Sequence, residues 1–133
     1  MKPMTVFLDL DGTVFKHEGK GQAEQVDAPL LPGARDAVNE LLKYGHYVVL
    51  TTGRREHLRA ETIKQLEHNR IAYDQLIMGL PPGPRVVVND QKPDGSITAG
   101  AVSHERNTVN WWDHESCVGL SSWASQKVPK QAK

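Results

Sequence analysis

The sequence has 133 residues, enough for one domain, and its 38% hydrophobic and 24% charged residues are typical of a globular protein with a buried core. Sixteen basic and sixteen acidic residues cancel, so the overall charge favours neither nucleic acid nor an anionic membrane as a partner. The apolar runs are far shorter than the roughly 20 residues that span a bilayer, and the first residues do not fit a signal peptide. The single cysteine, Cys117, excludes an intramolecular disulfide and is compatible with a cytoplasmic location.

The first half of the chain begins with an apolar strand, expected over residues 4–10, that suits the middle of a parallel sheet. The strand ends at Asp11-Gly12-Thr13, where Gly12 permits a sharp turn. Residues 14–31 are polar and without a clear period, which predicts a long loop or small hairpin acting as a lid. A helix is expected over residues 34–44, with Gly45 as its end.

The second half continues the alternation with a strand over residues 46–51, rich in β-branched residues, and a helix over residues 55–69. Short strands are expected over residues 75–78 and 85–89. Pro93-Asp94-Gly95 predicts a turn, followed by an edge strand over residues 96–102. The pattern after residue 107 is weak; we expect packing anchors at Trp111, Trp112 and Trp123 and a polar tail over residues 126–133.

Alternating strands and helices predict an α/β fold, a three-layer α/β/α sandwich around a Rossmann-like parallel sheet, formed by one domain over residues 1–125. In such sheets ligands bind beyond the carboxyl ends of the strands. Polar residues stand at three of these expected strand ends: Asp9 and Asp11, Thr51 and Thr52, and Asn89 and Asp90. We therefore expect them to converge on one crevice.

The carboxylates at these strand ends indicate the chemistry. Asp9 and Asp11 repel each other in a partly desolvated site unless a cation or a proton separates them. Mg²⁺ serves this purpose because it prefers one or two carboxylates together with a substrate phosphate, and Asp90 could supply another carboxylate. Donors for phosphate oxygens are also available: the hydroxyl of Thr51 or Thr52, the amides around Gly12 and Gly53, and the cation of Lys92 or Arg85.

Three stretches resemble motifs of the haloacid dehalogenase-like (HAD) superfamily. Residues 7–14, Phe-Leu-Asp-Leu-Asp-Gly-Thr-Val, resemble its first motif, hydrophobic residues followed by Asp-x-Asp-Gly-Thr/Val. Residues 48–54, Val-Val-Leu-Thr-Thr-Gly-Arg, are similar to the second motif, and residues 86–94, Val-Val-Val-Asn-Asp-Gln-Lys-Pro-Asp, to the fourth. The order and approximate spacing agree with the superfamily, and the resemblance covers about residues 4–102.

The resemblance implies a role for each matching position. Asp9 would be the nucleophile that forms an aspartyl-phosphate, and Asp11 the general acid and base. Mg²⁺ would be held by the Asp9 carboxylate, the main-chain carbonyl of Asp11, and Asp90. Thr52 is favoured as the hydroxyl of the second motif, and the third-motif cation is Lys92, with Arg85 as the alternate. The remaining positions expected to contact phosphate are Gly12, Thr51, Gly53 and Arg54.

Several of these residues also have an ordinary structural interpretation. Asp11-Gly12 alone would predict a turn, Thr51 could be a strand residue, and Thr52 could cap a helix. Lys92 is equally well explained as a solvated surface charge, and Arg85 is better explained as structural. Asp9 and the apolar strand before it favour the catalytic interpretation of the first motif.

By this resemblance the chain would be a Mg²⁺-dependent phosphatase without a large cap domain, acting on a small sugar phosphate or similar metabolite and possibly forming a homo-oligomer. A nucleic-acid end phosphatase or a phosphotransferase is an alternative, although the neutral charge argues against nucleic acid. From other classes, a receiver-like phospho-acceptor and a non-catalytic scaffold are alternatives. The Asp-x-Asp-Gly-Thr spacing and the clustered carboxylates disfavour these two.

Overall fold

The structure is a computed structural model that describes residues 3–19, 22 and 28–112, and these residues form two compact units. The first unit contains the described residues up to Pro82 together with Glu105–Val109. The second contains Gly83–His104 with the described residues from Asn110 onward. Some predictions lie outside the described residues, namely those for Cys117, Trp123, the tail over residues 126–133, and residues 20–21 and 23–27 of the expected lid.

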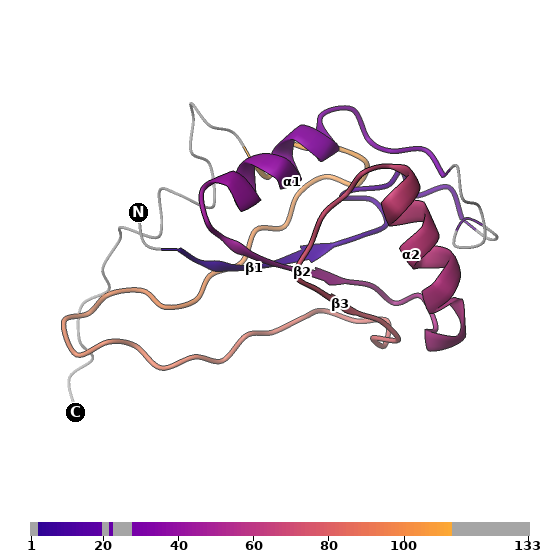
Figure 1. The fold of residues 1–133 in the computed structure, drawn as a ribbon. Helices are drawn as coiled ribbons and strands as arrows, with labels where there is room; N and C mark the ends of the chain where they lie inside the picture. The colour runs from indigo at the N-terminus through magenta and orange to yellow at the C-terminus, as the bar shows by residue number, and fades with distance from the viewer. Residues whose placement is uncertain (1–2, 20–21, 23–27, 113–133) are drawn as a thin grey trace. The chain divides into compact units, whose positions relative to one another are not determined.

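The first unit is built on a parallel sheet with the strand order β1-β2-β3 (Figure 1). The strands are β1 (Thr5–Asp9), β2 (Tyr47–Thr51) and β3 (Gln75–Ile77). Helix α1 (Ala34–Lys43) connects the first two strands, and the expected helix over residues 55–69 is divided into a 3₁₀ turn, η2 (Glu56–Leu58), and helix α2 (Arg59–His68). This confirms the predicted α/β class with a Rossmann-like parallel sheet.

The register of the sheet brings the carboxyl ends of its strands to one edge. Asp9 of β1 lies beside Thr51 of β2, and Thr51 lies beside Ile77 of β3. On one face of the sheet Leu8 and Leu50 are buried, whereas on the other face Val49 is buried and its register partner Phe7 is 58% exposed. Two of the three strand ends that the sequence predicts to be functional are therefore neighbours.

Helix α1 follows the apolar pattern expected from the sequence. Its buried residues are Ala34, Ala37, Val38 and Leu41, spaced three and four apart, so one stripe of the helix packs on the core. The helix ends at Gly45, which has φ 85° and donates its N–H to Leu42, while the N–H of His46 reaches the carbonyl of Leu41. This pair of bonds is a Schellman end, and it turns the chain directly into β2.

Helix α2 differs from α1 because two of its three buried residues are polar. Thr62 and Gln65 are fully buried beside Leu66. Buried polar side chains need hydrogen-bond partners, so this helix face must meet other polar groups.

Within the described part of the chain, no helix is both long and apolar enough to cross a membrane.

The segment after β1 confirms the expected loop or small hairpin over residues 14–31 where it is described. Phe15 and Leu30 form an antiparallel bridge, and Lys16 donates its N–H to the carbonyl of Pro29 at 2.9 Å. Phe15 is completely buried. The base of the segment is therefore attached to the core of the first unit.

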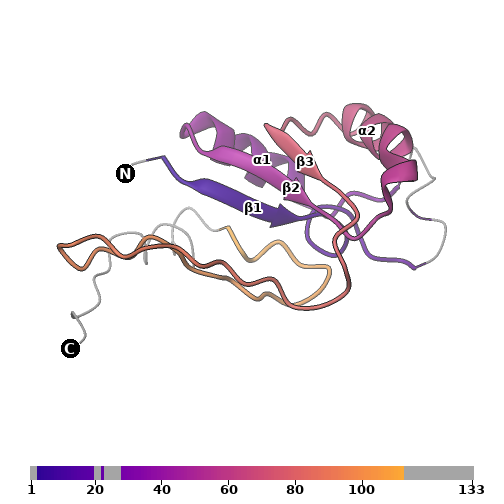
Figure 2. The same ribbon diagram turned by 90° about the horizontal axis from the view of Figure 1, so that it is seen from below.

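The prediction of strands over residues 85–89 and 96–102 is wrong, because neither segment forms a strand in the structure. Val86 and Val88 are 82% and 93% exposed, so the β-branched run forms no buried ladder. The two extended segments lie side by side in the second unit (Figure 2) and are joined by side-chain bonds, such as Asn89 Nδ2 to the Thr98 carbonyl at 3.2 Å. A run of valines favours an extended backbone, but only a partner strand completes a sheet.

The turn predicted at Pro93-Asp94-Gly95 is confirmed. Gly95 has φ 84° and donates its N–H to Lys92 at 2.9 Å, and Asp94 accepts the N–H of Ser96 at 2.9 Å. Among the expected packing anchors, Trp111 is buried, with 4% of its surface exposed.

Candidate active site

The turn after β1 carries the two carboxylates of the first motif. Leu10 accepts N–H bonds from Val14 at 2.8 Å and Phe15 at 3.0 Å, which closes the chain tightly after Asp9. Gly12 sits in this turn with φ 89°, a conformation that side chains with a Cβ rarely adopt. The Thr13 hydroxyl lies 3.4 Å from Asp9 Oδ2, at the far limit of a hydrogen bond.

The amide of Gly12, expected to bind phosphate, is already engaged. Its N–H donates to the Phe15 carbonyl at 2.7 Å, and its own carbonyl accepts the N–H of Asn107 at 2.8 Å. In this conformation Gly12 shapes the turn and offers no amide to a ligand. Its glycine identity is explained by the positive φ and by a close neighbour, since a Cβ at this position would lie 3.3 Å from Arg106 Cγ.

The end of β2 contributes Thr51 and Thr52, and both are buried. Thr51 is the register partner of Asp9, which places it at the same point of the sheet. Thr52 Oγ1 accepts the N–H of Arg54 at 3.1 Å, so its hydroxyl hydrogen is directed elsewhere. The choice between the two threonines for phosphate binding stays a prediction.

The loop after β3 packs closely on Thr52, Gly53 and Arg54. Leu80 donates its N–H to Thr52 at 3.2 Å, and Gly79 donates to Arg54 at 2.7 Å. Gly53 is exposed, and a Cβ on it would lie 3.3 Å from the Leu80 carbonyl oxygen. Glycine at this position therefore permits the close approach of two loops at the edge of the sheet.

Arg54, expected to contact phosphate, makes a bidentate ion pair with Asp11. Arg54 Nε lies 2.9 Å from Asp11 Oδ2, and Nη2 lies 2.7 Å from Oδ1. Only 4% of the Arg54 side chain is exposed, against 23% for Asp11. The guanidinium also lies 5.6 Å from the centre of the Phe15 ring, so it is covered by an aromatic face as well.

Helix α2 holds the other side of the same guanidinium. Arg54 Nη1 donates to Thr62 Oγ1 at 3.2 Å and to Gln65 Oε1 at 2.6 Å. These are the two buried polar residues of α2, so the helix face is satisfied by the motif that follows β2. Sequence reasoning missed both residues, although two polar positions three apart on the same stripe as Leu66 were the available signal.

Gln22 is a further residue of the site that sequence reasoning missed. Its Nε2 donates to Asp11 Oδ1 at 3.0 Å and to the Lys16 carbonyl, and its own carbonyl accepts from Gln65 Nε2 at 2.8 Å. Gln22 is 5% exposed. Both oxygens of the Asp11 carboxylate thus accept hydrogen bonds from buried side chains, and no sequence pattern pointed to Gln22.

Residues from far along the chain also reach the turn after β1. Asn107, with φ 64°, donates its N–H to Gly12, and its Oδ1 accepts the N–H of His17 at 2.7 Å. This anchoring places the carbon chain of Arg106 beside Gly12, while Arg106 itself is exposed. Sequence reasoning missed this cation because Arg106 lies outside the motif-like stretches and after the last expected strand.

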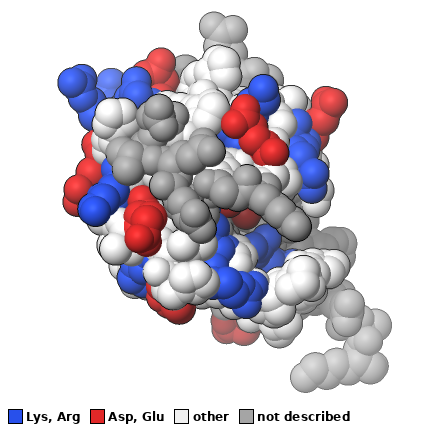
Figure 3. All heavy atoms as spheres, turned by 90° about the vertical axis from the view of Figure 1, so that its right-hand side faces the viewer, with Lys and Arg blue, Asp and Glu red and all other residues white. Residues whose placement is uncertain are grey.

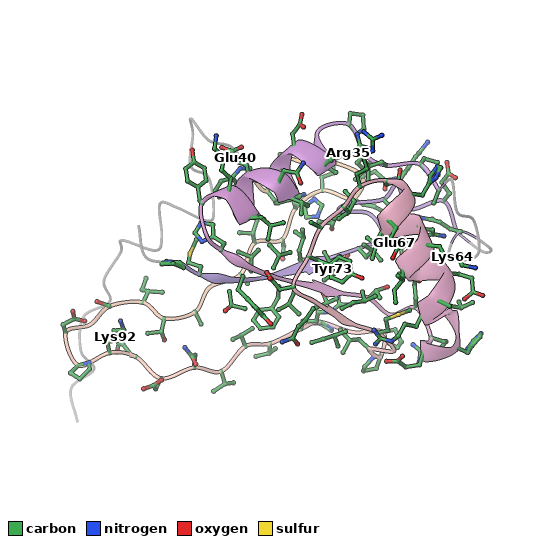
Figure 4. The ribbon with its side chains drawn as sticks, in the orientation of Figure 1. Arg35, Glu40, Lys64, Glu67, Tyr73 and Lys92 are labelled. Atoms are coloured by element: carbon green, nitrogen blue, oxygen red, sulfur yellow. The ribbon has the colours of Figure 1, made fainter. Side chains whose placement is uncertain are left out.

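Neither of the two cations expected for the third motif belongs to the first unit, which holds Asp9 and Asp11. Lys92 and Arg85 belong to the second unit, and Lys92 precedes its turn (Figure 4). Lys64 is exposed on α2. Arg59, at the start of α2, donates to both oxygens of Glu56 at 2.8 Å, and this pairing lowers the pKa of Glu56. The third-motif role of Lys92 or Arg85 stays a prediction.

Two of the three expected magnesium ligands lie at the end of β1, namely the Asp9 carboxylate and the main-chain carbonyl of Asp11. Both are oxygen donors, the type that Mg²⁺ takes, so their chemistry fits the ion. The Asp11 carboxylate is engaged by Arg54 and Gln22, which agrees with ligation through its main chain. Asp90 belongs to the second unit, and among the described residues no three His, Cys, Asp or Glu side chains gather to hold a metal. Its role as a ligand stays a prediction.

Comparison with solved structures finds chains of the Pnkp1/Rnl/Hen1 RNA repair complex in two structures. One is 26% identical over 57% of this chain, with a TM-score of 0.52, and the other is 25% identical over 70% of it, with a TM-score of 0.51. The sequence covers only 27% and 29% of those chains. A structural genomics target from Vibrio cholerae, 16% identical over 65% of this chain and 80% of its own, has a TM-score of 0.51 and shows the same fold.

No curated protein matches the sequence. A family model described as haloacid dehalogenase-like hydrolase matches residues 6–76, which is more than half of the chain. The match includes β1 from Val6 onward, Asp11 in the turn that follows, the end of β2, and α2, so it covers the residues that form the Asp11 and Arg54 cluster. The chain therefore belongs to the haloacid dehalogenase-like hydrolases.

Proposed function

We propose that this protein is a Mg²⁺-dependent phosphatase that hydrolyses a phosphate monoester through an aspartyl-phosphate on Asp9. The observation that carries this proposal is the position of Asp9, at the end of a strand whose register partner is Thr51, in a chain of the haloacid dehalogenase-like hydrolases. A carboxylate nucleophile and a hydroxyl that can bind a phosphate oxygen then stand on adjacent strands. Asp11 follows two residues later as the acid and base.

The reaction proceeds in two steps. In the first, an Asp9 carboxylate oxygen attacks phosphorus, the bond to the ester oxygen breaks, and Asp11 gives that oxygen a proton, so the alcohol leaves. In the second, Asp11 takes a proton from water, the water oxygen attacks the phosphorus of the aspartyl-phosphate, and inorganic phosphate and free Asp9 result. Arg54 and Gln22 donate hydrogen bonds to both Asp11 oxygens, which fixes the position of the group that gives and takes this proton.

The other residues bind and orient the phosphate. Thr52 or Thr51 donates a hydroxyl to a phosphate oxygen, and Gly53 lets the backbone approach it closely. Lys92, or Arg85 in its place, supplies the cation. The Asp9 carboxylate and the main-chain carbonyl of Asp11, with Asp90, would hold Mg²⁺, which supplies positive charge against the phosphate when bound.

We propose a small sugar phosphate or similar metabolite as the substrate. The formal net charge is zero, and on the face shown in Figure 3 the described basic and acidic side chains are interspersed. A phosphate backbone is bound through clustered positive charge, so these features favour a small ester over a polynucleotide.

A nucleic-acid end phosphatase is the second candidate, and the comparisons support it. Chains of an RNA repair complex are 25–26% identical to this chain and share its fold. A terminal phosphate requires fewer backbone contacts than binding along a strand, so the mixed charge does not exclude this substrate.

The test is phosphate release from a panel of sugar phosphates, nucleotides, p-nitrophenyl phosphate and an oligonucleotide with a terminal phosphate, with Mg²⁺ and with EDTA. Asp9→Asn should abolish turnover, whereas Asp36→Asn, an equivalent change on the exposed side of α1, should leave it unchanged. Preference for the oligonucleotide would favour the second candidate. Full turnover by Asp9→Asn would refute the nucleophile assignment, and no release by the wild type from any ester would refute the proposed function.

A further inference from the structure

Arg54 stands where a phosphate-binding cation would be expected, directly after the threonines at the end of β2. Its hydrogen bonds show a different use. The guanidinium donates twice to Asp11 and once each to Thr62 and Gln65, which occupies four of the five N–H groups that an arginine carries.

The main chain of Arg54 is fixed as firmly as its side chain. Its N–H donates to Thr52 Oγ1 at 3.1 Å, and its carbonyl accepts the N–H of Gly79 at 2.7 Å. The Phe15 ring lies 5.6 Å from the guanidinium carbon. To turn more than its one remaining N–H toward a phosphate, Arg54 would have to leave groups of Asp11, Thr62 or Gln65 unsatisfied, and burying unsatisfied polar groups is unfavourable.

Asp11 gains orientation from this arrangement. A fork of two parallel N–H···O bonds fixes the plane of a carboxylate as well as its position, which a single point charge cannot do. An acid or base acts only when its oxygen lies within hydrogen-bond reach of the transferred proton, so a fixed plane determines which oxygen faces the substrate.

We propose that Arg54 is a positioning residue that acts through Asp11 and does not bind the substrate phosphate. Thr62 and Gln65 of α2 hold the guanidinium in position, the guanidinium fixes the plane of the Asp11 carboxylate, and Asp11 transfers the proton. This inference rests on the proposed phosphatase function, because it assigns Asp11 the role of acid and base.

The leaving group separates this role from phosphate binding. Protonation of the leaving oxygen matters for a sugar alkoxide and hardly at all for p-nitrophenolate, which leaves readily without a proton. Arg54→Met should lower kcat/KM for a sugar phosphate by about 100-fold, at the lower end of the usual contribution of a general acid. The loss with p-nitrophenyl phosphate should be less than about tenfold. Arg55→Met, a change at the exposed neighbouring arginine, should alter neither value.

A double-mutant cycle provides the second readout. If Arg54 acts through Asp11, adding Arg54→Met to Asp11→Asn should lower kcat/KM for the sugar phosphate little further, because the group that Arg54 orients is already disabled. Gln65→Leu, which removes one support of the guanidinium, should give the same selectivity for leaving group in a weaker form. Circular dichroism shows whether each variant is folded. If Arg54→Met folds poorly, Gln65→Leu still allows the selectivity for leaving group to be measured.

Each alternative gives a different result. Equal losses with both esters would overturn the positioning role, because a residue that binds the phosphate acts on both esters alike. Losses that add fully in the double variant would also overturn it, because they would show that Arg54 acts independently of Asp11. A wild type that releases phosphate from no ester of the panel would refute the proposed phosphatase function and this role with it. Active wild-type enzyme with an unselective Arg54→Met variant would refute only the role of Arg54.

Discussion

Replacing Gln65 with leucine should destabilise the first unit without creating a cavity, because leucine and glutamine are similar in size. Gln65 is fully buried, and its side chain makes two bonds, accepting from Arg54 Nη1 at 2.6 Å and donating to the Gln22 carbonyl at 2.8 Å. Gln65→Leu leaves both partners without that bond in a buried place. At about 1–3 kcal/mol for each of these two buried unsatisfied groups, we expect a loss of about 2–6 kcal/mol in the free energy of unfolding.

The measurement is urea denaturation followed by circular dichroism, with the midpoint compared at an unchanged slope. Glu67→Leu is the matched control, since it introduces the same residue on the exposed side of the same helix and should change stability by no more than about 0.5 kcal/mol. If Gln65→Leu were as stable as the control, the buried network would contribute nothing, and the reasoning that ties α2 to Arg54 would fail.

Three further predictions concern other parts of the first unit. Burial lowers the pKa of His46 from 6.5, and its Nδ1 accepts the N–H of Met4 at 3.0 Å, so the unfolded chain binds a proton more readily. The stability that neutral His46 contributes should therefore be fully present above pH 6.5, the ordinary pKa of histidine, and should be lost as the pH falls from there toward the lower pKa of the folded state. The urea midpoint of the wild type should fall between about pH 7.5 and 5.5, and that of His46→Asn should fall less. Gly12→Ala should cost about 1–2 kcal/mol for its positive φ and more than Gly33→Ala, because only at Gly12 would the new Cβ crowd Arg106; equal thermal shifts would contradict this. Arg106 is an exposed cation whose carbon chain lies beside Gly12, in the turn that carries Asp11, so we expect it to contribute to binding an anionic substrate. Arg106→Met should then raise KM for the proposed substrate about tenfold, against no change for Lys64→Met; an unchanged KM would exclude Arg106 from substrate binding.

The fold of the first unit could be predicted because its pattern is local. The apolar stripe of α1, Gly45 at its end, and the β-branched run of β2 each define an element within a few residues. The valines after residue 85 carry the same local signal and yet form no strand. Whether such a run joins a sheet depends on a partner strand elsewhere in the chain, and the run itself does not contain that information.

The residues of the candidate site likewise fall into two groups, those that a local sequence pattern predicts and those that it does not. Asp9, Asp11 and Thr51 follow from motifs, since each stands at the end of an apolar strand and parallel strands end at one edge. Gln22 and Asn107 could not be predicted in this way. Gln22 reaches Asp11 through its side chain, whereas Asn107 donates its main-chain N–H to Gly12 and accepts the N–H of His17, 90 residues away, with its side chain. Both residues lie in loops, which carry no periodicity from which such contacts could be inferred.

Arg54 combines both situations, because a motif predicts that the residue belongs to the site but does not predict what its side chain contacts. The arginine of a Thr-Gly-Arg turn can extend toward a ligand or fold back onto Asp11. The choice depends on residues 8 and 11 positions later, because only Thr62 and Gln65 let the guanidinium be buried with its N–H groups satisfied. With apolar residues at both positions, burial would leave those N–H groups without partners, and the arginine would stay in solvent. In haloacid dehalogenase-like chains with the same turn, the polarity of these two helix positions should therefore predict whether the arginine supports the acid or is available to the substrate.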